Sequence, residues 1–465
     1  MKRLHSLWIG LLTCLFCLGF AIPAWAFCGF YVAKADTSLY NQASQVVIAR
    51  SGNRTVLTMA NDYQGEAQDF AMVVPVPVVL QPEQVQVAEP GVIERLDAFS
   101  APRLVEYFDP DPCAPEFALR QMPSAAAPAA ESLDAARGRN QALGVTVESR
   151  FSVGEYDILI LSARESRGLA NWLTQNGYRL PQGASQLLQP YIRQNLKFFV
   201  AKVNLKEYEA SGYQALRPLQ IRYESPRFML PIRLGMMNAQ PNQAHPTQDL
   251  IVYILSPEGQ AEVANYRTVK IPSDTELPLF VQEDFGEFYQ AMFSKSYERE
   301  GRNVAFLEYA WDMAGCDPCS ADPLTPDELR QAGVFWLTDP ASRPDSFQPW
   351  SQPSVFLSRL HVRYSRDRFP EDLMFQQTSN RSFFQGRYIL RHPFEGGTIT
   401  CAAGHQYRRN LAQRFEQEAQ TLARLTGWKI QEIRSKLPQL PRVEVLPWRQ
   451  GQPFWQRLWM ALWGG

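Results

Sequence analysis

The segment "SQVVIARSGNRTVLTMANDYQG", residues 44–65, holds two apolar, β-branched runs on either side of a short polar turn. Residues 46–50 and 55–59 therefore predict two strands, and residues 51–53 predict the turn of an antiparallel hairpin. Similar runs recur at 156–161, 197–205, 219–224, 228–233, 250–255, 304–311, 355–364 and 387–391. Because strands outnumber helices and many neighbours are close enough for hairpins, the pattern favours an α+β fold with largely antiparallel sheets.

One apolar run carries two prolines. Residues 70–80, "FAMVVPVPVVL", are almost wholly apolar but include Pro75 and Pro77. Since proline has no N–H to donate to a sheet, this run predicts an edge strand or an interrupted strand.

Helices are predicted between the strands and at the C-terminal end. Ser162 and Glu165 match a Ser-x-x-Glu capping box that would open a helix ending at Gly177, and a second helix is expected at 186–194. Thr325 and Pro326 predict the start of another. Near the C-terminus, apolar residues recur every three or four positions up to Gly427, at Leu411, Phe415, Ala419, Leu422 and Leu425. This stripe predicts a long amphipathic helix, followed by a shorter one at 429–437.

The N-terminus has the pattern of an export signal. Lys2 and Arg3 precede an apolar stretch at 7–22, and Ala24-Trp25-Ala26 follows as a small-x-small cleavage site. We expect residues 1–26 to be a signal peptide, cleaved after Ala26, and the protein to be exported to the periplasm, cell envelope or extracellular space. The alternative is an uncleaved membrane anchor, for which the stretch is short.

The expected organisation after the signal has three parts. Residues 27–340 form the α+β core, with an alanine-rich linker near 121–144. Residues 341–440 add C-terminal strands and helices, either as part of the same domain or as a domain of their own. Residues 441–465 form a tryptophan-rich tail that either packs on the fold or contacts a membrane peripherally through Trp455, Trp459 and Trp463. A formal net charge of −1 gives no electrostatic case for nucleic-acid binding.

Five cysteines follow the signal and are the candidate site residues. Export would place them in an oxidising compartment, where structural disulfides are the favoured interpretation, with at most two bridges and one spare thiol. The sequence Asp-Pro-Cys occurs at 111–113 and again at 317–319, which makes these two segments candidate partners. A redox pair or a metal site are the alternatives, but acidic residues around 316–319 disfavour a thiolate. The candidates are Cys28, Cys113, Cys316, Cys319 and Cys401.

The sequence assigns no catalytic residue, no cofactor and no metal. It contains no Gly-x-Ser-x-Gly elbow, no phosphate-binding glycine loop and no His-Glu-x-x-His helix. We interpret each of the four histidines that follow the predicted signal peptide as structural: His245, His361, His392 and His405. Glu308 and Asp312 share a strand face but would lie roughly 13 Å apart, too far for a retaining glycosidase pair. Aspartates in the same region suggest calcium only as a minor alternative.

Several motifs together resemble a known family. The stretches "CGFYVAKADT", "FSAPRLVEYFDPDPC", "GEYDILILSARES", "YESPRFMLPIRLG" and "FLEYAWDMAGCDPCSADPL" are similar to the bacterial domain-of-unknown-function family number 2330, in the same order along the chain. The likeness runs from about Cys28 to at least Leu337. It implies an exported bacterial protein, often membrane-associated, and brings no reaction or ligand.

The favoured interpretation is therefore a non-catalytic binding or scaffolding module of the cell envelope, stabilised by disulfides, with an unknown envelope partner or ligand. An enzyme is less favoured. The alternative is a thiol–disulfide redox protein that uses Cys316 and Cys319.

Overall fold

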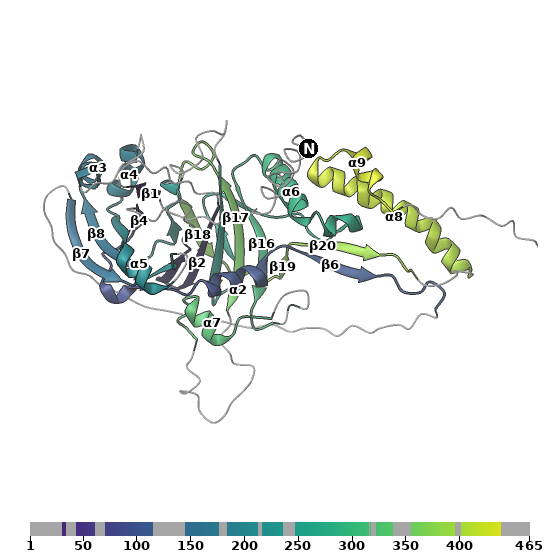
Figure 1. The fold of residues 1–465 in the computed structure, drawn as a ribbon, viewed down its shortest axis with the longest axis horizontal. Coiled ribbons are helices and arrows are strands. Elements are labelled where there is room, and N and C mark those ends of the chain that lie inside the picture. Colours follow the sequence, from purple (N-terminus) through teal and green to yellow (C-terminus); the bar gives the residue numbers. More distant parts are fainter. Residues whose placement is uncertain are drawn as a thin grey trace, which may run out of the picture.

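The computed structural model describes residues 30–33, 43–60, 70–114, 145–175, 184–212, 216–235, 247–315, 317, 322–337, 355–395 and 401–438. Within these ranges the fold is α+β, built on two large sheets with helices on their outer faces (Figure 1). The predicted signal peptide, the 121–144 linker, Gly177 and the 441–465 tail lie outside the described residues.

The smaller of the two large sheets is antiparallel throughout. Its strand order is β1 (Phe30–Ala33), β4 (Phe70–Val76), β9 (Lys197–Val203), β8 (Tyr156–Ala163) and β7 (Val145–Val153). Pro75 lies in β4 beyond the last pair that β4 forms with β1, Phe30 opposite Val73. Pro75 still pairs with Phe198 of β9, and the strand ends at Val76, directly before Pro77. The run is therefore interrupted at Pro77, and the alternative of an edge strand is wrong because β4 lies between β1 and β9.

The larger sheet has nine strands and mixed directions. Its order is β14 (Arg267–Lys270), β16 (Val304–Asp312), β17 (Phe356–Tyr364), β12 (Gln248–Ser256), β2 (Ala43–Ser51), β3 (Arg54–Met59), β10 (Leu219–Glu224) and β5 (Val85–Val87), and β19 (Phe384–Gln385) also pairs with β16. The β14–β16 and β12–β2 pairs are parallel, and the others are antiparallel.

The hairpin predicted from residues 46–59 is confirmed. Strands β2 and β3 pair with Val46 opposite Met59, and Gly52 takes the positive φ of +55° that the turn requires. Val46 contributes to the core on one face of the sheet and Val47 to the core on the other. Because both faces of this strand are covered, its sequence is continuously apolar instead of alternating.

Two three-stranded sheets complete the strands. One is antiparallel, with the order β11 (Met229–Leu230), β18 (Leu373–Gln377) and β13 (Ala261–Val263). The other is parallel, with the order β15 (Thr275–Leu277), β20 (Arg387–His392) and β6 (Arg103–Phe108). The run at 228–233 thus contributes only a two-residue strand, shorter than expected.

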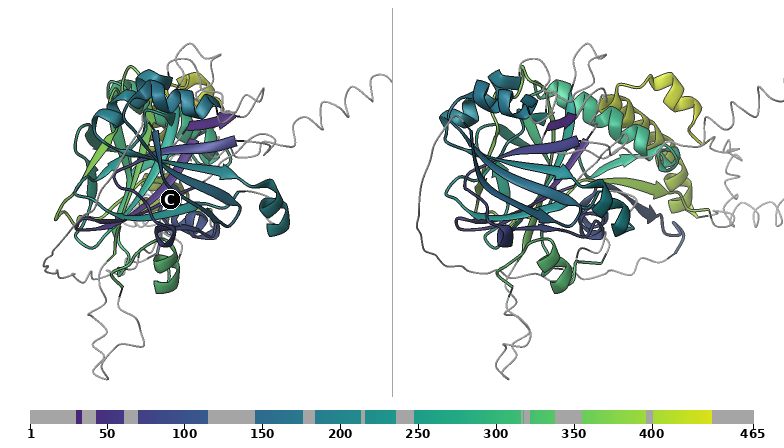
Figure 2. Two further views of the ribbon diagram at one scale, coloured as in Figure 1. Left: turned by 90° about the vertical axis from the view of Figure 1, so that its left-hand side faces the viewer. Right: turned by 60° about the vertical axis from the view of Figure 1, so that its left-hand side comes forward.

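The main hydrophobic core lies between the two large sheets, where Ile48 and Leu360 of one sheet join the same cluster as Ile158 and Phe199 of the other. Helices α3 (Ser166–Gln175) and α4 (Ala184–Arg193) cover the outer face of the five-stranded sheet. Helices α2 (Gly91–Ser100) and α7 (Pro326–Gln331) cover the outer face of the nine-stranded sheet. In all three views α7 lies on the side of the molecule opposite α3 and α4 (Figures 1 and 2).

A further helical layer packs against β16 and β20. It consists of α6 (Phe285–Arg299), α8 (Ala402–Thr426) and α9 (Ile430–Ser435), preceded by the short turn η3 (Leu279–Gln282). The predicted C-terminal helices are confirmed, and Gly427 ends α8 with a φ of +79°. The remaining short helices are α5 (Leu205–Ser211) and η1 (Pro82–Gln84).

The capping box predicted at Ser162 is wrong, and the helix start predicted at Thr325 is confirmed. Ser162 lies inside β8, opposite Thr146 of β7, so strand pairing holds it extended and the helix begins four residues later at Ser166. At α7 the predicted N-cap is present, because Thr325 accepts from the Glu328 N–H. The Glu328 carboxylate also accepts from the Thr325 N–H, which completes a capping box that the sequence analysis did not predict.

Strand β17 belongs to the predicted 341–440 segment but lies between β16 and β12 of the nine-stranded sheet. The boundaries at 340 and 440 remain predictions. Among the helices of the described ranges, none combines the length and apolar character needed to cross a membrane.

Candidate functional site

The side chains best suited to acid–base chemistry meet on the outer face of the nine-stranded sheet. Glu308 of β16 is fully buried and accepts a hydrogen bond from Arg359 Nε of β17 at 2.6 Å. The other oxygen of Glu308 lies 2.8 Å from His361 Nδ1 and accepts from the Tyr289 hydroxyl of α6. Glu308 alternates with the inward-facing Leu307, which places its side chain on this outer face. A β-bulge between Leu307 and Tyr309 leaves Glu308 without a residue opposite it in β17.

Further ion pairs extend this group to both sides. Arg359 donates to Asp97 Oδ1 of α2 at 2.7 Å, and Arg363 holds the Asp249 carboxylate with two bonds of 2.7 and 2.8 Å. His361 Nε2 lies 3.5 Å from Asp249 Oδ1. We call Glu308, Arg359, His361, Asp249, Arg363, Asp97 and Tyr289 the ionic network.

Within the network, neighbouring opposite charges shift the pKa values of Glu308 and His361 in the direction opposite to the effect of burial. Burial alone would raise the pKa of Glu308, but His361 and Arg359 lower it to about 2. Burial alone would lower the pKa of His361, but the Glu308 and Asp249 carboxylates raise it. When His361 is protonated, three carboxylates face two guanidinium groups and an imidazolium, so the charges of the network balance.

The ionic network acts as a structural clamp, meaning that its ion pairs and hydrogen bonds hold two helices on the nine-stranded sheet. Tyr289 comes from α6 and Asp97 from α2, so the same buried charges fix two helices on one sheet. Glu308 has no exposed surface, and the pocket described below does not include any member of the network. Asp312, the other acid considered for a hydrolase, forms an ion pair with Arg381.

The predicted histidines have different surroundings. His361 belongs to the network. His392 Nε2 lies 2.7 Å from Glu106 Oε2 and its ring stacks on Phe108 at 4.4 Å. The His405 N–H continues the first turn of α8, and His245 lies outside the described residues.

Two of the five candidate cysteines form a disulfide. Cys113 and Cys401 are bonded, with Cα atoms 5.8 Å apart and 288 positions between them in sequence. The repeated Asp-Pro-Cys motif had pointed Cys113 toward the 316–319 segment instead. The pairing follows from the parallel β6–β20 pair, since both strands end together, one shortly before Cys113 and the other before the segment that leads to Cys401.

Because Cys113 is bonded to Cys401, it cannot serve as a ligand in the metal site that the sequence analysis gave as an alternative for the cysteines. Cys28, Cys316 and Cys319 lie outside the described residues, so their pairing stays a prediction. Nowhere in the described ranges do three or more His, Cys, Asp or Glu side chains form a group able to hold a metal ion. Asp317, one of the aspartates considered for calcium, is buried and accepts from the Tyr309 hydroxyl at 2.9 Å and from Gln385 at 3.0 Å.

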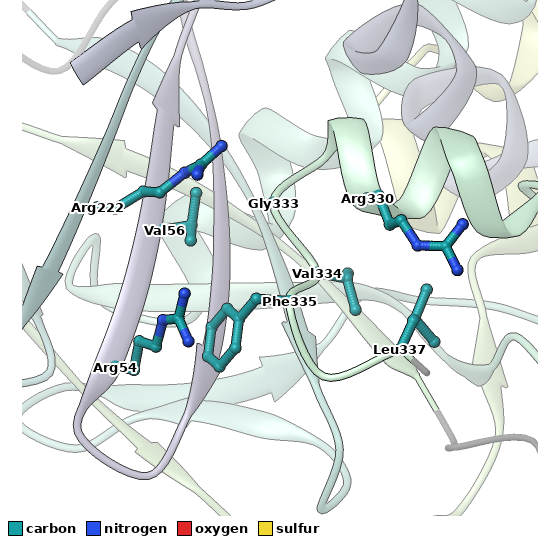
Figure 3. A pocket seen from close by; sticks show the side chains of 8 residues that line it. All are labelled: Arg54, Val56, Arg222, Arg330, Gly333, Val334, Phe335 and Leu337. Carbon is teal, nitrogen blue, oxygen red and sulfur yellow. The ribbon is translucent and has the colours of Figure 1, made fainter. Parts of the chain in front are cut away.

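A different part of the same sheet carries an open pocket of about 190 Å³. We call it the arginine hollow. Figure 3 shows Arg54 and Arg222 reaching from the strand side and Arg330 lying beyond the chain that follows α7. The full lining is Arg54, Val56, Arg222, Arg330, Gly333, Val334, Phe335 and Leu337.

The local sequence explains how the hollow forms. Arg222 of β10 lies opposite Val56 of β3, and Arg54 precedes Val56 by two residues, so all three side chains share one face. Gly333 follows α7 with a φ of +97°, and a Cβ atom there would lie 2.6 Å from Val56 Cγ1. Only glycine lets the chain approach β3 this closely, and that approach brings Phe335 under Arg54.

The hollow is positively charged. The Arg54 guanidinium lies 4.2 Å from the centre of the Phe335 ring, and Arg222 donates to the neutral Gln86 amide at 2.8 Å. In the described part of the chain neither guanidinium forms an ion pair; Glu224, opposite Arg54 in the β3–β10 register, does not line the hollow. Arg330 pairs with the exposed Asp327 at 2.6 Å.

These groups can bind an anion but cannot perform nucleophilic or acid–base catalysis near neutral pH. Among the described residues, the lining contains guanidinium, aliphatic and aromatic side chains and no carboxylate, imidazole, thiol or hydroxyl. Sequence reasoning missed both this hollow and the ionic network, since their residues come from strands and helices that are far apart along the chain.

The comparisons with known proteins identify a family and no activity. The family model for an uncharacterized protein conserved in bacteria, DUF2330, matches residues 22–376. No curated protein and no solved structure shows significant similarity to the chain. The match includes the arginine hollow, Glu308 and His361, and it ends before Cys401 and α8. With most of its length matched, the chain belongs to the DUF2330 family of uncharacterised bacterial proteins.

Proposed function

We propose that this protein is an exported envelope protein that binds an anionic ligand, without catalysis, in the arginine hollow. The observation that carries the proposal is the lining of the hollow, where the guanidinium groups of Arg54 and Arg222 have no carboxylate partner among the described residues. Arginine is the side chain that best recognises carboxylate and phosphate groups, since its planar fork donates several hydrogen bonds.

The ionic network supports a binding role over an enzymatic one. Its acids and base are enclosed between the sheet, α2 and α6, while the open hollow has no group able to transfer a proton near neutral pH. A catalytic site needs its reactive groups within reach of the substrate.

The binding test uses the mature chain and a set of small anions. We expect measurable binding to wild type and at least a tenfold loss in the variant that combines Arg54→Gln with Arg222→Gln. Arg167→Gln is the matched control, because Arg167 is an exposed arginine on α3, which covers the other large sheet. Equal binding by the double variant and wild type would reject the hollow as the ligand site.

Export and membrane contact are separate parts of the proposal. Their support is the signal pattern at 1–26 and the tryptophans at 455, 459 and 463. Mass spectrometry of the purified protein should find Phe27 as the first residue. Deleting residues 454–465 should move the protein from the membrane fraction to the soluble fraction, and unchanged fractionation would argue against a tail anchor.

A further inference from the structure

We propose that the arginine hollow selects an organic phosphate, with the phosphate dianion between Arg54 and Arg222 and an apolar group on Phe335 and Leu337. This inference rests on the proposed function, since it names the class of ligand for the same site. Three observations carry it, namely the charge of the hollow, the fixed positions of the two guanidinium groups, and the apolar floor.

The charge of the hollow favours a dianion over a monoanion. Arg54 and Arg222 each bring one positive charge that the described chain leaves without an ion-pair partner. Arg330 adds a third guanidinium at the margin, already bonded to Asp327. A carboxylate would neutralise one guanidinium, whereas a phosphate monoester near pH 7 carries about −1.5 to −2 and can neutralise two.

The guanidinium groups are held in place before a ligand arrives. The Arg222 Nη2 bond to Gln86 continues through Gln86 Nε2 to Gln220 Oε1 at 2.7 Å, and the buried Gln220 donates to Thr58 Oγ1 at 2.8 Å. Arg54 rests on the Phe335 ring at 4.2 Å, which leaves its N–H edges free for hydrogen bonds. Pre-organised donors lower the entropy lost when a ligand binds.

The spacing of the two arginines suits a tetrahedral group. They occupy diagonal positions on neighbouring antiparallel strands, since Arg222 faces Val56 and Arg54 lies two residues before it. Diagonal neighbours lie roughly 7–8 Å apart at the backbone. Phosphate presents three terminal oxygens in different directions and can accept from both side chains, whereas a flat carboxylate is best matched by a single fork.

The floor of the hollow would contact the apolar group that is bonded to the phosphate. Phe335 and Leu337 are the half-buried apolar side chains of the lining that a ligand can contact, since Val56 and Val334 are each only 1% exposed. An inorganic phosphate ion would leave this apolar surface in contact with water, whereas a small apolar group bonded to the phosphate would cover it. A phospholipid headgroup and a soluble phosphate ester share this chemistry, so separate probes are needed to distinguish them.

The experiment compares four probes on the mature chain by isothermal titration and co-sedimentation: phenyl phosphate, benzoate, inorganic phosphate, and vesicles of phosphatidic acid with phosphatidylcholine as reference. We expect phenyl phosphate to bind at least tenfold more tightly than benzoate or inorganic phosphate, and to weaken below about pH 6 as it loses its second charge. Arg54→Gln and Arg222→Gln should each reduce the affinity about tenfold, with Arg167→Gln unchanged.

The outcomes separate this inference from the proposed function. If benzoate binds as tightly as phenyl phosphate, the phosphate assignment fails while anion binding in the hollow stands. If inorganic phosphate binds as tightly as phenyl phosphate, the proposal that the hollow also binds an apolar group fails. If no anion binds, both proposals fail. Arg54→Lys and Arg222→Lys keep the positive charge but remove the planar guanidinium group. Affinity equal to wild type in these variants would show that charge alone, and not guanidinium geometry, binds the phosphate. Sedimentation with phosphatidic acid vesicles, lost in the glutamine variants, would assign the phosphate to a lipid headgroup.

Discussion

Replacing Glu308 with Gln tests whether the ionic network is a structural clamp. The substitution keeps the size of the side chain but removes the charge that faces Arg359 at 2.6 Å and His361 at 2.8 Å. Arg359 would retain Asp97, and His361 would retain only Asp249 at 3.5 Å. Removing one partner of a buried ion pair typically costs 3–5 kcal/mol, because the other charge remains buried without compensation. We therefore expect the free energy of unfolding to fall by about 3–5 kcal/mol.

The pH dependence provides a second, independent signature. Glu308 has a lowered pKa, so its contribution is complete above 4.5 and is lost as pH falls toward about 2. His361 has a raised pKa, so its contribution is complete below 6.5 and is lost as pH rises through its folded value. The network should stabilise the wild type most between about pH 4.5 and 6.5. In the variant, burial should dominate at His361, and the loss of stability above pH 6.5 should disappear or reverse.

Urea unfolding followed by tryptophan fluorescence at pH 5.5 and pH 8 measures both quantities. Glu300→Gln is the control, because Glu300 makes ion pairs with Arg267 and Arg299, whose side chains are largely exposed. Such surface pairs contribute less than about 1 kcal/mol. A loss below about 1 kcal/mol in Glu308→Gln, with an unchanged pH profile, would refute the clamp and reopen a functional role for this acid.

Three further predictions concern other parts of the fold. Cys113→Ser should lower the free energy of unfolding by about 3–5 kcal/mol in urea titrations without reductant, since the bond to Cys401 closes a loop of 288 positions; equal stability would mean that the bridge does not form. Burial raises the pKa of Glu418 to about 7, so the folded chain loses stability as this carboxyl group loses its proton. Glu418→Gln should therefore stabilise the protein by about 1–2 kcal/mol above pH 7 and have little effect at pH 4.5. Destabilisation above pH 7 would contradict the raised pKa. Gly333→Ala should lower the thermal midpoint by several degrees and weaken anion binding, because its Cβ would lie 2.6 Å from Val56; an unchanged midpoint would show that the chain relaxes there.

The sequence predicted local elements well wherever apolar pattern and turn chemistry agreed. The β2–β3 hairpin, the N-cap of α7 and the long helix α8 all follow from residues within a few positions of each other. Ser162 was misread because a capping motif and a strand end can share the same letters. Pairing with Thr146, which is distant in sequence, determines that Ser162 is extended.

The candidate site was much less predictable. Glu308 was noticed as an acid, but its three partners come from α6 and β17, and no spacing in the sequence joins them. The arginine hollow depends on a strand register and on the close approach that Gly333 allows. Likewise, the bond from Cys113 to Cys401 reflects the parallel β6–β20 pair, which the sequence analysis did not anticipate.

The central claim is that the arginine hollow is a binding site for an organic phosphate. A crystal structure of the mature protein soaked with phenyl phosphate tests it most directly. We expect the phosphate to lie between the Arg54 and Arg222 guanidinium groups, with its oxygens about 2.7–2.9 Å from their nitrogens. The phenyl ring should lie on Phe335 and Leu337. An empty hollow, or phenyl phosphate bound only elsewhere on the protein, would contradict it.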